Sequence, residues 1–267
     1  MNTLMNGVNG IFINHKILSE GSKSNSRNGE VLKFEEFVTR ISDPNRPFVG
    51  GYERAINPFF LIIESYWIFI GGKDVATLKP YNDRIADYSD DGINFNAPYG
   101  WRLRNWGIDS MKERDMMQLG GSDQIAKCVN LLNEDPTTRR AIASIWNPSF
   151  DLHNNDSKDL PCNDMLKFKV SADGKLALTI FNRSNDLHWG LPTNVVQFSV
   201  IGQLVAYVLG LEYGKQTHFS DDLHVYTSNP IADRMEKSYN TYGGIFKDFE
   251  SIYDFCEPIS YKIFQDG

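Results

Sequence analysis

The chain has 267 residues, of which 41% are hydrophobic and 23% are charged, and its net charge is −7. This composition is that of an ordinary globular protein, and the acidic charge argues against nucleic acid as the main partner. No apolar run approaches the roughly 20 residues that cross a bilayer, and the first residues do not resemble a secretory signal. Three widely spaced cysteines, Cys128, Cys162 and Cys256, favour a reducing cytoplasm over a disulfide framework.

The first half of the chain predicts helices and a long surface excursion. Residues 57–69 form an apolar run that contains Glu64 and predict a buried helix. Residues 77–96 are polar and predict the surface excursion. Ser122 can cap a helix that ends near Asp135, where a proline follows.

The second half predicts strands around one dominant helix. Residues 140–146 predict a strand, and residues 166–170 and 175–181 flank a Gly-containing turn and predict a hairpin. Residues 194–209 are the most apolar helical segment. Strands and helices do not alternate strictly, so we predict a single α+β domain over residues 1–267.

The most informative segment is TIFNRSNDLHWGLPTN, which runs from residue 179 to residue 194. A strand brings Arg183, Ser184 and Asp186 to its end, and a Gly-Leu-Pro break places Asn194 at a helix start. An arginine suits a phosphate, and a carboxamide can both donate to and accept from a heterocycle. The segment therefore predicts a site for a phosphorylated heterocycle.

Cys162 and Glu64 could supply chemistry at such a site. Cys162 is either a small buried hydrophobe or a nucleophilic thiolate, and the second requires a cation such as Arg183 to lower its pKa. Glu64 is costly to bury unpaired, and burial would raise its pKa into a range suited to proton relay. Adjacent Asp221 and Asp222 have no further ligand pattern, so we expect no metal site.

Three other arginines have ordinary explanations as well as functional ones. Arg27 lies in a Gly- and Ser-rich segment that can wrap a phosphate or can simply be a solvated loop. Arg139 and Arg140 follow a predicted helix end, where they could complement the helix dipole or bind an anion.

Together these motifs resemble the thymidylate synthase superfamily, which includes the pyrimidine nucleotide hydroxymethylases. The similarity extends over residues 21–229 and rests on Arg27, Glu64, Tyr99-Gly100, Arg139-Arg140, Pro161-Cys162, the segment 183–194 and His224-Val225-Tyr226. It implies a mixed sheet packed by helices and a homodimer formed across that sheet. It also implies a pyrimidine nucleoside monophosphate as substrate and 5,10-methylenetetrahydrofolate as one-carbon donor.

The resemblance assigns roles to the matching residues. Cys162 would add to ring carbon 6, Glu64 would relay protons, and Asp186 would organise folate and water. Residues that would bind the nucleotide are Arg27, Arg139, Arg140, Arg183, Ser184, Asn194, His224 and Tyr226. The pair Arg139-Arg140 would reach into the partner subunit's site.

Departures from the methylating members favour hydroxymethylation, in which water ends the reaction instead of hydride. Asn82 stands where methylases have a shielding tryptophan, and could admit or orient water beside the folate. Residues 262–267 are unlike the hydrophobic methylase tail, and Asn163 replaces a histidine. Asn194 can serve uracil or cytosine by flipping, so the base stays open. A thymidylate synthase and an inactive nucleotide- or RNA-binding relative are the alternatives.

Overall fold

The computed structural model describes residues 2–4, 7–41, 43–45, 47, 56–107, 122–153 and 156–242. The strands are β1 (Asn2–Leu4), β2 (Ser22–Ser26), β3 (Gly29–Ile41), β4 (Ile142–Ser144), β5 (Asn163–Val170), β6 (Leu176–Asn182), β7 (Asn185–Asp186) and β8 (Tyr213–Tyr226). The helices are α1 (Gly7–Glu20), α2 (Pro58–Ile70), η1 (Asp83–Tyr88), α3 (Tyr99–Arg104), α5 (Gln124–Glu134), α6 (Pro148–Asp151), α7 (Gly190–Val208) and α8 (Pro230–Tyr242).

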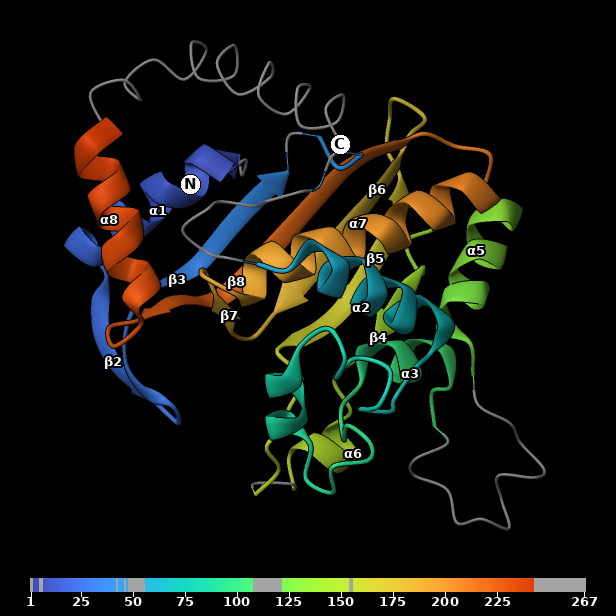
Figure 1. The fold of residues 1–267 in the computed structure, drawn as a ribbon. Helices are drawn as coiled ribbons and strands as arrows, with labels where there is room; N and C mark the ends of the chain where they lie inside the picture. The colour runs from blue at the N-terminus through green and yellow to red at the C-terminus, as the bar shows by residue number, and fades with distance from the viewer. Residues whose placement is uncertain are drawn as a thin grey trace, which may run out of the picture.

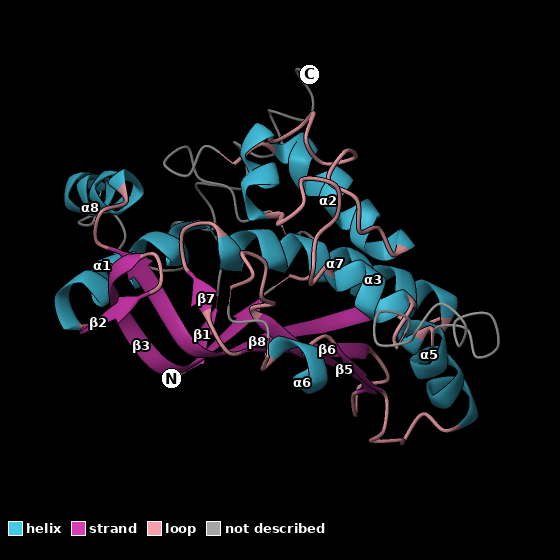
Figure 2. Cartoon of the chain, turned by 90° about the horizontal axis from the view of Figure 1, so that it is seen from below, coloured by secondary structure: helices cyan, strands magenta, loops and turns pink. Residues whose placement is uncertain are grey.

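These strands form one eight-stranded mixed sheet in the order β1-β3-β8-β6-β5-β4, with β2 paired to β3 and β7 paired to β8. Strand β8 runs antiparallel to β3 and parallel to β6 and β7, so it joins both halves of the sheet (Figure 1). The long helices α1, α2 and α7 lie on one side of the sheet (Figure 2). This confirms the predicted mixed α+β fold.

Helix α7 forms the centre of the main core. Its buried side chains Phe198, Ile201 and Val205 share one hydrophobic cluster with residues of β5 and β6. By length and composition α7 could cross a membrane, but 67% of its most apolar window is buried inside the protein. Its apolar character is therefore explained by its place in the core.

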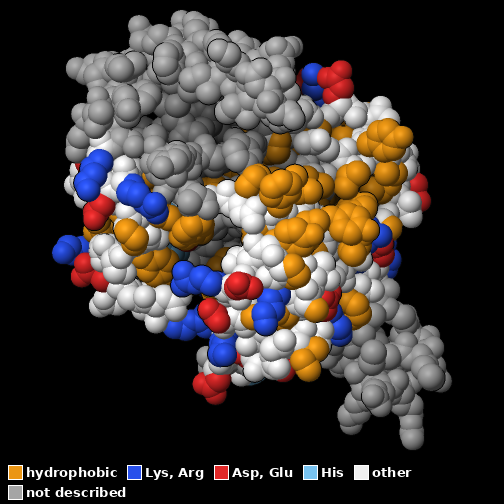
Figure 3. Space-filling view, in the orientation of Figure 1, with side chains coloured by type: hydrophobic (Ala, Val, Ile, Leu, Met, Phe, Trp, Pro, Cys, Tyr) orange, Lys and Arg blue, Asp and Glu red, His pale blue; other side chains and the backbone are white. Residues whose placement is uncertain are grey.

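Helix α2 is not the buried helix that its composition predicts. One face packs against α7, yet Phe59, Ile62, Tyr66 and Ile70 are more than half exposed. Their spacing places them on the opposite, outward side of the helix. Figure 3 shows hydrophobic side chains gathered on the surface where α2 and α7 lie.

Other expectations differ in detail. The side chain of Asp123, and not Ser122, caps α5 by accepting a hydrogen bond from the Ala126 amide at 3.0 Å. The β5–β6 hairpin is confirmed, and Gly174 in its turn has a φ of 78°, which glycine adopts without strain. Arg27 does not lie in an open loop, because residues 22–41 form the β2–β3 hairpin.

Candidate active site

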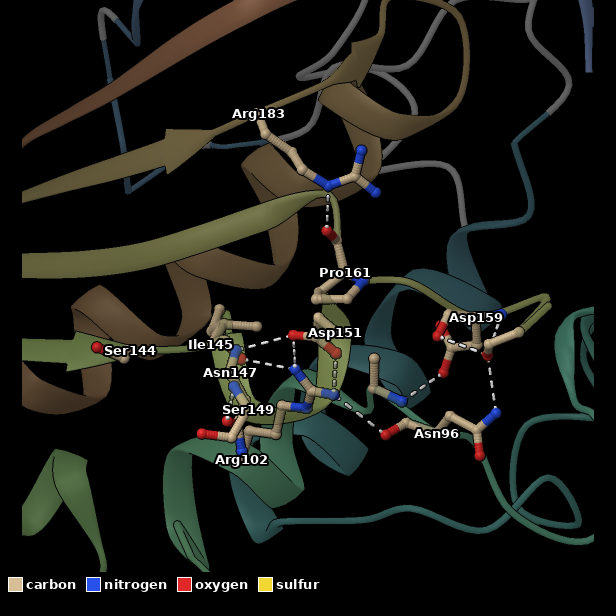
Figure 4. A network of polar contacts seen from close by, with 12 residues as sticks. Asn96, Arg102, Ser144, Ile145, Asn147, Ser149, Asp151, Asp159, Pro161 and Arg183 are labelled. Carbon is tan, nitrogen blue, oxygen red and sulfur yellow. Dashed lines mark hydrogen bonds and ion pairs between the residues drawn. The ribbon is translucent and has the colours of Figure 1, made fainter. Parts of the chain in front are cut away.

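Cys162 and Arg183 meet at one edge of the sheet, where β5 begins and β6 ends. The two strands are antiparallel and pair Asn163 with Asn182, so the residues next to this pair become neighbours. The Arg183 amide donates to the Cys162 carbonyl at 3.1 Å, and Arg183 Nε donates to the Pro161 carbonyl at 2.9 Å. Figure 4 shows the Arg183 side chain directed at the Pro161 carbonyl. The guanidinium is therefore close enough to Cys162 to act on the pKa of its thiol, as the sequence predicts.

A buried ion pair supports the segment that leads to Cys162. Arg102 forms a two-pronged contact with Asp151, with N–O distances of 2.6 and 2.8 Å, and both side chains are buried. Arg102 also donates to the Ile145 carbonyl at 2.8 Å. Nearby, Asp159 accepts a hydrogen bond from the Ala97 amide at 2.7 Å (Figure 4). These contacts fix the approach of the chain to the cysteine.

The electrostatic surroundings of Cys162 only partly match the expectation of a lowered pKa. Burial of the thiol raises its pKa, while Arg183 and Arg27 act in the opposite direction. The carboxylates of Asp159 and Asp164 add to the increase. Desolvation therefore outweighs the two cations, and the pKa of the Cys162 thiol is raised.

Arg27 lies in the two-residue turn of the β2–β3 hairpin and reaches across to the segment before Cys162. Its guanidinium donates to the Ser157 carbonyl at 2.9 Å and to the Lys158 carbonyl at 3.4 Å. The β2–β3 hairpin thus brings a second cation toward the cysteine from a distant part of the sequence.

A row of carboxamides lies next to Cys162 on the neighbouring strands. Asn163 Oδ1 accepts hydrogen bonds from Asn182 Nδ2 and, at 3.4 Å, from Asn194 Nδ2 on α7. Asn185 donates to the Ser220 hydroxyl at 3.2 Å. All four carboxamides are at least nine-tenths buried.

Several polar atoms of this region have no hydrogen-bond partner among the described residues. They are Glu64 Oε2, Asn163 Nδ2, Asn182 Oδ1, Asn185 Oδ1 and Gln197 Oε1. Buried polar atoms in native proteins are normally paired, so such a concentration marks a place for a polar ligand or ordered water. Asn194 lies one turn inside α7 and not at its start, which brings it deeper into this region than expected.

Glu64 approaches the same region from α2. The carboxamide of Gln197, one turn after Asn194 on α7, donates a hydrogen bond to the Glu64 carboxylate. Burial raises the pKa of Glu64 to about 7, and this hydrogen bond limits the increase. The residue as a whole is partly exposed, whereas its Oε2 atom is buried.

Asp186 and His224 face each other across the β7–β8 pair. Both carboxylate oxygens of Asp186 accept backbone hydrogen bonds, from the amides of His188 at 2.9 Å and Trp189 at 3.3 Å. His224 contacts Asp222 at 2.9 Å through Nδ1, and its ring meets the Tyr226 ring edge to face at 5.2 Å. Partly buried Ser184 lies between Arg183 and this group.

Three predicted site residues are not brought to this chain's own Cys162. Arg139 and Arg140 are exposed. The carbonyl of the next residue, Ala141, accepts a hydrogen bond from the Phe168 amide, which places the pair beside Phe168. Phe168 is six residues along the chain from Cys162. At about 3.3 Å per residue, that separation is about 20 Å. Asn82 accepts from the Arg84 amide at 3.2 Å and caps η1, and no contact joins it to Cys162 or Glu64 in the described chain.

Sequence reasoning missed two polar residues and left a third without a role. Gln197 lies in an apolar helical run, and Asn182 lies within the segment 179–194 but was given no role there. The Tyr99 hydroxyl hydrogen-bonds with the Cys162 backbone, and burial raises the pKa of this phenol. Position along the helix or strand could have flagged the first two, because Gln197 follows Asn194 by one turn and Asn182 precedes Arg183.

No group of three potential metal ligands occurs within the residues the structure describes. Cys128 is buried in the main core, and burial raises its pKa to about 11, as expected for a structural thiol. Cys256 and the segment 262–267 lie outside the described residues.

Comparison with known proteins identifies the family of the chain. The thymidylate synthase family matches residues 12–241 of the chain. A deoxyuridylate hydroxymethyltransferase of Bacillus phage SP01 is 38% identical over 256 residues, covering 92% of this chain and 66% of the relative. A protein of the same name from Pseudomonas phage M6 is 35% identical over 234 residues, covering 86% of this chain and 63% of the relative. The chain thus spans about two thirds of the length of these relatives. It belongs to the thymidylate synthase family.

Proposed function

We propose that the protein transfers a one-carbon unit from 5,10-methylenetetrahydrofolate to a pyrimidine nucleoside monophosphate and ends the reaction with water, giving a 5-hydroxymethyl base. The observation that carries this proposal is Cys162 held beside Arg183, next to a row of buried carboxamides with unpartnered atoms. Two phage relatives named deoxyuridylate hydroxymethyltransferase support water as the final nucleophile.

The name of the same relatives supports deoxyuridylate as the substrate we propose, among the bases that the sequence leaves open. Asn194 would accept from N3–H of uracil and donate to O4. Its contact with Asn163 supports this role, because one N–H of Asn194 is held there while its oxygen stays available. Arg27, Arg183 and Ser184 would bind the phosphate, and His224 and Tyr226 the sugar.

In the proposed mechanism Cys162 adds to ring carbon 6, and carbon 5 becomes nucleophilic. The folate would supply the methylene carbon to carbon 5 and leave as tetrahydrofolate after carbon 5 has lost its proton, which leaves an exocyclic methylene group on the base. Tyr99 and Asn163 hold the segment that carries the sulfur, and Glu64 exchanges protons at the base. Loss of the thiolate from carbon 6 restores the ring double bond at the end.

The residues around Asp186 suit a folate. A carboxylate accepts from the amino and ring N–H groups of a pterin, and 43% of the adjacent Trp189 surface is exposed for aromatic contact. Asn82 would line the same folate site. The residue before it, Tyr81, is held at the start of α2, because its carbonyl accepts a hydrogen bond from Asn57 at 3.0 Å.

We further propose one cytoplasmic domain that works as a homodimer across the open face of the sheet. That face carries a groove of about 330 Å³ lined by residues of β3, β5, β6 and β8. Phe219 is 41% exposed there and stacks on Phe181 at 5.1 Å. The distance of Arg139 and Arg140 from their own Cys162 supports a role in the partner's site.

Product analysis tests the function. The protein is incubated with methylenetetrahydrofolate and, separately, with uridine or cytidine monophosphate, each with and without the 2′-hydroxyl. We expect deoxyuridylate to be the preferred substrate and mass spectrometry to detect 5-hydroxymethyldeoxyuridylate. Formation of a methylated base together with dihydrofolate would instead show a thymidylate synthase. Nucleotide binding without turnover would favour the inactive relative.

Substitution Asn194→Asp should shift base preference toward cytosine. A protonated carboxyl can donate to N3 of cytosine and accept from its amino group, whereas an ionised one is a poor partner for O4 of uracil. We expect the kcat/KM ratio of deoxyuridylate over deoxycytidylate to fall by about 10-fold to 100-fold, the scale of one or two hydrogen bonds. An unchanged ratio would show that Asn194 does not contact the base.

A further inference from the structure

Glu64 and Gln197 each present a buried acceptor without a partner among the described residues. Gln197 is 3% exposed, and its amide hydrogen-bonds to the Glu64 carboxylate across the α2–α7 contact. This leaves Glu64 Oε2 and Gln197 Oε1, both buried and both without a partner in the described parts of the chain. Because a carboxylate can only accept, the Gln197 amide must point its nitrogen toward Glu64 and its oxygen away.

Two neighbouring buried acceptors are satisfied by a molecule with two donors. A water molecule has two O–H groups and could donate one to Glu64 and one to Gln197. Its lone pairs would then point away from both residues. Gln197 follows Asn194 by three residues, a rise of about 4.5 Å along α7, so this water would lie near the base that Asn194 contacts.

Resting on the proposed function, we propose that Gln197 is a positioning residue that holds Glu64 and the water that attacks the exocyclic methylene group of the base. The water oxygen forms a bond to the methylene carbon while one of its protons passes to Glu64. The electron pair of the exocyclic double bond moves toward carbon 4, then returns to form the ring double bond as the carbon 6–sulfur bond breaks. Cys162 leaves as thiolate, and no oxidant or reductant is required.

The test compares Gln197→Met, which keeps length and removes both polar atoms, with Gln203→Met as matched control. Gln203 lies on the same helix and donates to the Pro44 carbonyl at 3.2 Å, away from Glu64. Product is measured in the presence of a small thiol, which competes with water for the methylene carbon. Gln197→Met should lower water capture about tenfold and raise the thiol-captured share, while Gln203→Met should match wild type.

A second readout does not depend on turnover. Infrared titration of the Glu64 carboxyl in the free protein should show a higher pKa in Gln197→Met than in wild type, because a hydrogen bond to the ionised form is lost. Gln197→Glu, a variant of the same shape, should raise it as well through like-charge repulsion. Retained nucleotide binding would show that the variants are folded.

The outcomes separate the two proposals. If wild type forms no hydroxymethyl product, the proposed function fails. If wild type forms it, but both Gln197 variants keep the wild-type product ratio and Glu64 titration, the function stands and the role of Gln197 is wrong.

Discussion

Cys162→Ser should reduce turnover by about 1,000-fold or more, the scale seen when an enzyme loses its nucleophile. A serine hydroxyl cannot ionise beside Arg183 as a thiol can, so addition to ring carbon 6 would not start. Nucleotide affinity should largely survive, because Arg27, Arg183 and Asn194 are unchanged. Steady-state kinetics and calorimetric binding of deoxyuridylate give both quantities.

The matched control is Cys128→Ser, on a helix in the main core. Placing a hydroxyl in this buried position should lower the free energy of unfolding by about 1–3 kcal/mol without a comparable effect on turnover. Near-normal turnover of Cys162→Ser would remove the covalent mechanism.

Glu64→Gln should reduce kcat by about 100-fold or more, the usual contribution of a general acid–base group. In wild type the pKa of Glu64 is raised to about 7, and a base must be ionised to accept a proton from water. Hydroxymethylation should therefore fall as the pH drops through about 7. In Glu64→Gln this inflection should disappear.

We also expect the rate to increase at alkaline pH as Cys162 ionises, because burial raises the pKa of its thiol. This increase should remain in Glu64→Gln. A glutamine variant that keeps the inflection near pH 7 would assign it to another group. Asp164, whose pKa is raised to about 6 mainly by burial, is the next residue to substitute in that case.

The sequence predicted the contact of Cys162 with Arg183 because both belong to recognisable motifs. One precedes the first strand of a hairpin and the other follows its second strand, so antiparallel pairing brings them together. It placed the β5–β6 hairpin correctly since a glycine turn and two apolar runs are local signals. The outward face of α2 could not be predicted, because its few polar residues, Glu64 and Ser65, do not form a polar side that marks the solvent.

Contacts between side chains of distant segments could not be predicted from the sequence either. The contact of Gln197 with Glu64 joins helices more than 100 residues apart, and Arg27 reaches the Cys162 segment from a hairpin whose first strand is polar. The expected lowering of the Cys162 pKa by Arg183 is present but is outweighed by burial, and the degree of burial depends on packing that a linear pattern does not contain.

The most direct measurement is the fate of oxygen during turnover of deoxyuridylate in water labelled with heavy oxygen. Mass spectrometry should find the heavy atom in a hydroxymethyl group on carbon 5, with tetrahydrofolate as the other product. An unlabelled methyl group accompanied by dihydrofolate would contradict the account.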